Sequence, residues 1–238
     1  MHSEKNVGTG LLSLSKSVEM NKKDYYQALN ILPWQPRAAH LSTNEPNQID
    51  ADQSATWDSL RSCVAACTAC SLHTSRTQTV FGIGNVSAKL MIIGEAPGFY
   101  EDQQGEPFVG RAGQLLNVML KSIDLERNQV YIANILKCRP PNNRDPAPDE
   151  VRSCTTFLDK QIALIQPSLL MAVGRIAAHY LLQTKASLES LRHKMHQYGT
   201  QNTPLIVTYH PAYLLRNPKD KKKAFEDLRM VRKKLIEE

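Results

Sequence analysis

Short, continuously apolar runs alternate along this chain with longer segments in which apolar residues recur at helical spacing. Runs of this kind are typical of strands that are buried on both faces of a sheet. We expect strands at 89–93, 130–136, 169–173 and 205–209. Helices are predicted at 57–70, 110–123, 149–165, 175–182 and 219–236. Because strands and helices alternate, the pattern predicts an α/β fold with a parallel sheet covered by helices on both faces.

The first quarter of the chain does not follow this pattern. Residues 1–55 are mostly polar and are expected to form an N-terminal extension and linker, whereas residues 56–238 are expected to form one domain. Within the extension, DYYQALNILPWQPR at 24–37 predicts a short amphipathic helix that Pro33 ends. This segment is similar to the N-terminal peptide of the psi subunit of the bacterial replicative clamp loader, which makes it a candidate docking peptide for a replication protein.

Composition and charge indicate the cellular compartment of the protein and the kind of partner that it binds. The chain has 238 residues, a formal net charge of +6 and a pI near 9.0. This charge favours an anionic partner such as nucleic acid, although a modest excess of Lys and Arg is also common in other proteins. No apolar run approaches the roughly 20 residues that span a bilayer, and the first residues lack the apolar core of a signal peptide. We therefore expect a cytoplasmic protein with no membrane partner and with reduced cysteines.

Two loop motifs follow predicted strands. GEAPGFYEDQQGEPFVGRAGQLL occupies 94–116, and YHPAYLLRNP occupies 209–218. Both are rich in Gly, Pro, His or acidic residues, and the carboxyl ends of strands are where α/β folds place their chemistry. The two motifs therefore predict one shared functional site.

Four of the five cysteines suggest a metal or cluster site. Cys67 and Cys70 form a C-x-x-C pair, while Cys138 follows a strand and Cys154 lies in the next predicted helix. Four thiolates suit zinc or an iron–sulfur cluster equally well, and Cys138 and Cys154 are alternatively small buried core residues. Cys63 lies four residues before Cys67 at helical spacing, and we interpret it as a bystander.

From the residues alone, three classes of function remain open. The chain could be a nucleic-acid-acting enzyme, or a non-catalytic nucleic-acid-binding module with a structural metal. It could also be a small-molecule enzyme that uses GEAPG as a phosphate loop. That motif lacks the Lys and Ser/Thr of a Walker loop and the three glycines of the dinucleotide fingerprint, which argues against the last class.

The motifs in their order resemble the iron–sulfur (family 4) uracil-DNA glycosylases. The resemblance covers roughly residues 60–235 and rests on TVFGIGNVSAKLMIIGEAPGFYEDQQGEPFVGRAGQLL, YIANILKCRPPNNRDPAPDEVRSC and TYHPAYLLRNPKDK. It implies a three-layer α/β/α sandwich with a central parallel four-stranded sheet. It also implies a [4Fe–4S] cluster held by Cys67, Cys70, Cys138 and Cys154.

The resemblance also implies a set of uracil contacts. Glu95 and Ala96 would lie at the base-binding turn, Phe108 would stack on the flipped base, and Glu101 would lie near C5, where bulk excludes the methyl group of thymine. Asn134 ends a predicted strand, and its amide offers the donor and acceptor that O4 and N3–H of uracil require.

The expected chemistry is hydrolysis of the N-glycosidic bond in single- or double-stranded DNA, by a monomer. His210 would donate to uracil O2 and stabilise the leaving anion. Cluster-free uracil glycosylases have an Asp where this chain has Ala96, so the resemblance leaves no obvious general base. Glu95 is one candidate, although in the family it is better described as a pocket residue, and we expect stabilisation of the leaving group to dominate over activation of the water. No lysine at the site suggests a Schiff base, which predicts a monofunctional enzyme. A covalently trapping branch of the family has a histidine in a basic insertion that is missing from KCRPPNNRDPAP, so we expect turnover.

The last motif is also expected to contact DNA. A side chain must fill the gap that a flipped base leaves, and Leu214, in an expected exposed loop, is the first candidate for this wedge, with Leu215 as the second. Arg216, Lys219 and the basic run 221–223 would hold phosphates, although this run is alternatively a solvated start of a helix.

Overall fold

The computed structural model describes residues 57–237. The candidate docking peptide at 24–37 lies outside the described residues, as does the rest of the extension at 1–55. Within the described part of the chain, no helix combines the length and the apolar character needed to cross a membrane.

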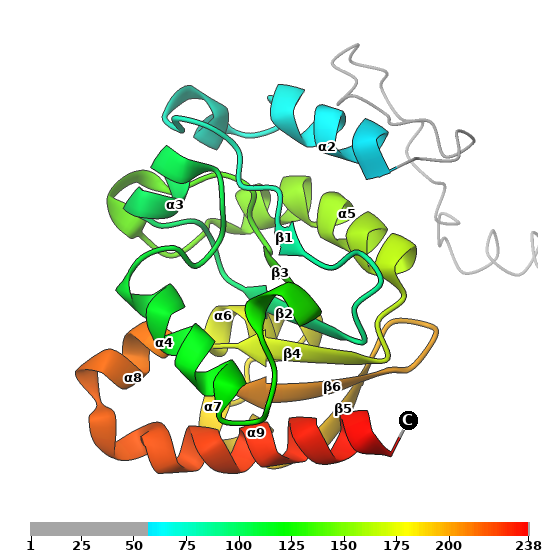
Figure 1. Cartoon of the computed structure of the whole chain (residues 1–238). Helices are drawn as coiled ribbons and strands as arrows, with labels where there is room; N and C mark the ends of the chain where they lie inside the picture. Colours follow the sequence, from blue (N-terminus) through cyan, green and yellow to red (C-terminus); the bar gives the residue numbers. More distant parts are fainter. Residues whose placement is uncertain (1–56, 238) are drawn as a thin grey trace, which may run out of the picture. The chain divides into compact units, whose positions relative to one another are not determined.

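A six-stranded sheet forms the centre of the described domain (Figure 1). Its strands follow the spatial order β1 (Ile83–Gly84), β3 (Tyr131–Asn134), β2 (Leu90–Gly94), β4 (Leu169–Val173), β6 (Thr203–Thr208) and β5 (Met195–Tyr198). Strands β3, β2, β4 and β6 are parallel, and they correspond to the four predicted strands. The predicted parallel centre is therefore confirmed.

The two edge strands were not predicted. Strands β1 and β5 pair antiparallel with β3 and β6. Strand β1 has two residues, and β5 has the mostly polar sequence MHQY, so neither carries the apolar run that marks a buried strand. The sheet is thus mixed rather than four-stranded, and its edges are short and half exposed.

Helices cover both faces of the sheet and complete three layers (Figure 1). The helices are α2 (Trp57–Ala66), α3 (Phe99–Gln104), α4 (Arg111–Lys121), α5 (Pro148–Ile165), α6 (Arg175–Leu181), α7 (Leu188–Leu191), α8 (Pro211–Arg216) and α9 (Lys221–Ile236). Along β2, Met91 and Ile93 pack with α2, α5 and α6, whereas Leu90 and Ile92 pack with α4, α8 and α9. This alternation follows from the two-residue period of a strand and confirms the three-layer sandwich.

Short helices replace two expected loops. Helix α8 begins at Pro211, a favoured first position, so the expectation of an exposed loop at 209–218 is wrong. Helix α3 lies within the first loop motif. Helix α2 ends at Ala66 rather than 70, and a 3₁₀ turn, η1 (Ser71–Thr74), follows the C-x-x-C pair. Three further 3₁₀ turns are η2 (Arg127–Gln129), η3 (Pro141–Asn143) and η4 (Pro218–Asp220).

A buried ion pair joins α9 to the residue that follows α7, and a hydrogen bond connects it to the end of β6. Arg192 Nε donates to Asp227 Oδ2 over 2.7 Å and Nη2 donates to Oδ1 over 3.2 Å, and both side chains are 0% exposed. Thr208 Oγ1, on the last residue of β6, donates to the same Oδ2 over 2.8 Å. Such a pair is stable only while every partner is present, because each charge is costly to bury alone.

We predict that Asp227→Asn lowers the thermal unfolding midpoint by about 6–20 °C. Breaking a buried ion pair costs about 3–5 kcal/mol, and a domain of this size loses roughly 2–4 °C per kcal/mol. Thermal unfolding followed by circular dichroism measures the shift. Glu237→Ala is the control, because the Lys233–Glu237 pair is largely exposed and should contribute little. Equal midpoints for the two variants would show that the Arg192–Asp227 pair adds no stability.

Candidate functional site

A pocket of about 430 Å³ lies at the carboxyl ends of β2, β3 and β6. Parallel strands end on the same edge of the sheet, so residues that follow them meet there. The pocket brings together all six residues expected to contact the base: Glu95, Ala96, Glu101, Phe108, Asn134 and His210.

Asn134 supplies an unpaired acceptor to this pocket. It ends β3, is 2% exposed, and its Oδ1 has no hydrogen-bond partner within the described chain. An unpaired buried acceptor costs about 1–3 kcal/mol, so it favours a ligand that donates a hydrogen bond. Gly94, its neighbour on β2, leaves the necessary room, because a Cβ there would lie 2.4 Å from Oδ1 and 2.8 Å from Phe108 Cζ.

Phe108 is held in a left-handed backbone conformation with φ of 54°. This conformation costs a non-glycine residue about 1–2 kcal/mol and must be held by its surroundings. The Glu101 carboxylate does so, because its Oε1 accepts from the backbone N–H of Val109 over 3.1 Å and of Gly110 over 3.2 Å. Glu101 therefore lines the pocket and also fixes the loop that carries the aromatic ring.

His210 is a neutral imidazole with a defined tautomer. Its Nδ1 accepts from the Ala212 N–H over 3.1 Å and caps α8, so the ring proton is on Nε2. Burial, and to a lesser extent the charge of Arg216, lowers the pKa of His210 to about 4, while Glu101 opposes the shift. Gly174, with φ of 95°, passes behind the ring, where a Cβ would lie only 2.9 Å from His210 Cβ. The centroids of the Phe108 and His210 rings lie 5.6 Å apart.

Glu95 follows β2 and carries a carboxyl with altered acidity. Burial, and to a lesser extent the charge of Asp145, raises the pKa of Glu95 to about 7, while Arg175 opposes the shift. Near neutral pH this side chain can therefore exchange a proton, which is the property of a general acid or base.

The residues of one wall of the pocket were not predicted from the sequence. Pro140, Asn143 and Arg144, from the Pro-rich loop after β3, line it, as does Tyr213 of α8. The position of this loop at the end of a parallel strand was the signal that could have placed it in the site. Arg144 is held by the buried carboxylate of Glu150, to which Nη1 donates over 2.9 Å.

The residues expected to contact DNA occupy different environments. Leu214 is not in an exposed loop: it lies in α8, is 1% exposed and packs in the core, because the helix turns it inward. Leu215 is 36% exposed. Arg216 lines the pocket, and Lys219 is exposed in η4. Lys223, in the basic run, pairs with acidic side chains within 3.5 Å.

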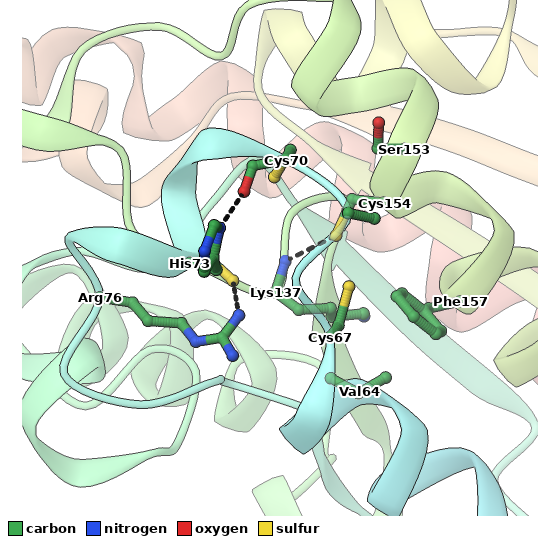
Figure 2. A pocket seen from close by; sticks show the side chains of 11 residues that line it. Val64, Cys67, Cys70, His73, Arg76, Lys137, Ser153, Cys154 and Phe157 are labelled. Atoms are coloured by element: carbon green, nitrogen blue, oxygen red, sulfur yellow. Dashed lines mark hydrogen bonds between the residues drawn. The ribbon is translucent and has the colours of Figure 1, made fainter. Parts of the chain in front are cut away.

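A second hollow contains the four predicted ligand cysteines (Figure 2). Cys67, Cys70, Cys138 and Cys154 line it, and Cys63 does not. All are free thiols. Figure 2 shows Cys67 and Cys70 around the same space as Cys154, which is more than 80 residues away in the sequence. Among residues 57–237, no three His, Cys, Asp or Glu side chains are arranged to hold a single metal ion.

The donor set of this hollow fits a thiolate-bound group. Arg76 Nη1 donates to Cys138 Sγ over 3.1 Å, and the Lys137 backbone N–H donates to Cys154 Sγ over 3.2 Å. Hydrogen bonds of this kind stabilise negative sulfur. Burial raises the pKa of Cys154 to about 12, so this thiol needs a cation beside it to ionise.

Lys137 connects the hollow to the pocket. Its side chain is buried, and Nζ donates to the Asn134 carbonyl over 2.9 Å and to Gln161 Oε1 over 2.7 Å. The residue therefore lies between the cysteines and the strand end that carries the unpaired amide oxygen.

Comparisons with known proteins agree with this geometry. A family model described as the uracil DNA glycosylase superfamily matches residues 81–229. The type-4 uracil-DNA glycosylase of Sulfurisphaera tokodaii is 43% identical over 73% of this chain and 82% of its own length. The type-4 uracil-DNA glycosylase of Archaeoglobus fulgidus is 40% identical over 71% of this chain and 87% of its own.

The fold and the pocket thus define a member of the uracil-DNA glycosylase superfamily. Within that superfamily, the chain belongs to the type-4 family. A type-5 uracil-DNA glycosylase of Thermus thermophilus is less similar, at 29% identity over 54% of this chain. The expected family resemblance is therefore confirmed.

Proposed function

We propose that this chain removes uracil from DNA by hydrolysing the N-glycosidic bond, which leaves an abasic site. The observation that carries this proposal is the unpaired Oδ1 of Asn134, which shares one pocket with the Phe108 and His210 rings. The relatives at 40–44% identity are named uracil-DNA glycosylases, which supports the same reaction.

Asn134 reads the base. Its Oδ1 accepts from N3–H of uracil, and its Nδ2 donates to O4. Cytosine has an acceptor at N3 and a donor at the 4-amino group, so it leaves both hydrogen bonds unmade. Phe108 stacks on the flipped base, a contact worth about 1–3 kcal/mol. Exclusion of the thymine methyl group by Glu101 stays a prediction, and the bonds of Glu101 to the Phe108 loop support it by fixing the pocket wall.

His210 stabilises the leaving group. As the bond to the sugar breaks, negative charge gathers on uracil O2, and the neutral imidazole donates Nε2–H to that atom. Because the ring is already oriented by its bond to Ala212, little reorganisation accompanies the reaction. A preorganised donor of this kind contributes about 10²–10³ in rate.

Glu95 is the group in the pocket that can take a proton from the attacking water. Ala96 offers no carboxylate, and the raised pKa of Glu95 suits a base that works near neutral pH. Among the described residues that line the pocket there is no lysine, which supports a monofunctional reaction without a Schiff base.

The DNA contacts follow from the exposure of the α8 side chains. Leu215 replaces Leu214 as the proposed wedge, because Leu214 is committed to the core. Arg216 and Lys219 are proposed to bind the phosphates on either side of the flipped nucleotide.

We further propose that Cys67, Cys70, Cys138 and Cys154 hold a [4Fe–4S] cluster. Four thiols around one hollow, two N–H donors to sulfur and the resemblance to the iron–sulfur family support it. When bound, the cluster supplies a covalent cross-link between segments that are distant in sequence. Lys137 then connects that cross-link to the end of β3.

Release of uracil from a labelled single-stranded oligonucleotide tests the function. We expect strand cleavage only after alkali treatment, none from a thymine-containing oligonucleotide, and a loss of about 10²–10³ in rate for His210→Ala, because this variant lacks the donor to O2. Absence of release from an iron-loaded preparation that still binds DNA would favour the non-catalytic binding module instead.

The pH dependence of the single-turnover rate tests Glu95. Only the ionised carboxylate accepts a proton, so the rate should rise about tenfold per pH unit below pH 7 and level off above the pKa of about 7. His210, with its pKa of about 4, should contribute no change in this range. Glu95→Gln should be slower and lack the rise. The same rise in Glu95→Gln would remove Glu95 from the role of base.

Iron and sulfide content with the visible absorption spectrum tests the cluster. We expect about four irons per chain in the native protein and loss of both iron and colour in Cys138→Ser, because one thiolate ligand is missing. Cys63→Ser is the matched control and should keep both, since Cys63 does not line the hollow. Zinc in place of iron, or equal loss in the two variants, would reject this ligand set.

A further inference from the structure

Two adjacent aromatic rings are exposed at the rim of the pocket. Phe99 is 50% and Tyr100 is 61% exposed at the start of α3. Their neighbours Gly98 and Glu101 line the pocket, so the rings stand beside its mouth. The two rings meet edge to face, with centroids 5.4 Å apart and planes at 82°. Exposure of two neighbouring aromatic side chains at a binding site is typical of a contact surface.

The pair is attached to both walls of the pocket. The Tyr100 ring lies against Gly110, where a Cβ would be 3.4 Å from Cδ2, and Gly110 is in the loop that carries Phe108. The Arg139 guanidinium, next to the pocket-lining Pro140, lies 5.1 Å from the centre of the Phe99 ring. Each ring therefore has a contact that holds it in place, unlike a side chain that projects freely from a surface helix.

Arg139 itself is oriented by the Pro-rich loop. Its Nε donates to Asn143 Oδ1 over 2.8 Å, and Asn143 lines the pocket. A guanidinium held over an aromatic ring keeps its charge available to a phosphate and adds to stacking by a cation–π interaction. The rim thus combines two exposed rings with a fixed positive charge.

We infer that Phe99, Tyr100 and Arg139 form a stacking platform for the nucleotides that flank the excised base in single-stranded DNA. This inference rests on the proposed function, because it places the uracil in the adjacent pocket. Aromatic rings bind bases of any sequence through their π-faces, and Arg binds the backbone between them. The platform selects single strands, because the flanking bases of a duplex are already stacked and paired, whereas those of a single strand expose their faces.

The test compares uracil release from single-stranded and duplex oligonucleotides by Tyr100→Ala, Phe99→Ala and Arg139→Gln. On single strands we expect KM to rise about 5- to 100-fold for Tyr100→Ala or Phe99→Ala and kcat to stay within about twofold, since stacking contributes to binding. On duplexes KM should change little. Tyr100→Trp, which keeps an aromatic ring, should bind single strands about as well as the native protein. Phe225→Ala is the matched control, because it removes an exposed aromatic ring from a different helix, α9.

A second substrate identifies the contact directly. Oligonucleotides in which an abasic spacer replaces the base on one side of the uracil should bind the native protein more weakly, and the Tyr100 and Phe99 variants should no longer distinguish them from the parent. An unchanged KM on single strands, an equal loss on duplexes, or the same loss in Phe225→Ala would overturn the platform. If one ring variant fails to fold, the other ring variant and the spacer series still decide the question.

The outcomes separate the platform from the proposed function. If native protein releases uracil while the rim variants bind single strands normally, the platform fails and the function stands. If no variant releases uracil, fluorescence anisotropy with uracil-free single strands still measures the platform. Weaker binding by the rim variants then supports it, and equal binding rejects it.

Discussion

Close approach of backbone and side chains at the carboxyl edge of the sheet is the constraint on which the site depends. Gly94 lies so near Asn134 and Phe108 that any side chain there would occupy the space of the amide oxygen. Gly174 does the same for His210 from the next strand end. The Asn134 amide, the Phe108 ring and the His210 imidazole can share one pocket because two backbone positions carry no Cβ.

Buried hydrogen bonds and an ion pair fix the positions of strand ends that apolar packing alone does not specify. The Asp227 carboxylate accepts hydrogen bonds from Arg192 and from the hydroxyl of Thr208, which ends β6 two residues before His210. Behind β3, the Lys137 ammonium binds the carbonyl of Asn134. Apolar packing gives cohesion without direction, whereas a satisfied hydrogen bond specifies one position. The two sides of the pocket are therefore fixed by groups that do not line it.

The pocket shifts the pKa values of the titratable side chains inside it, and it also carries positively charged arginine side chains. Desolvation lowers the pKa of His210 and raises that of Glu95, so both favour their neutral forms more than in water. Arg144 and Arg216 also line this pocket and contribute positive charge to it. A neutral interior suits a leaving group that becomes an anion only in the transition state, while the arginines attract a polyanion before reaction.

Apolar periodicity and the order of motifs are properties of the chain itself, and they predicted the α/β class, the four parallel strands and the six residues that line one pocket. The tertiary structure decided what those patterns leave open. It buried Leu214 through α8, brought cysteines from three segments of the chain to one hollow, and added the Pro-rich wall and the Phe99–Arg139 rim. Burial, pairing and proximity arise only when segments pack together. The sequence around a leucine in a polar motif therefore does not reveal whether its helix directs that side chain into the core.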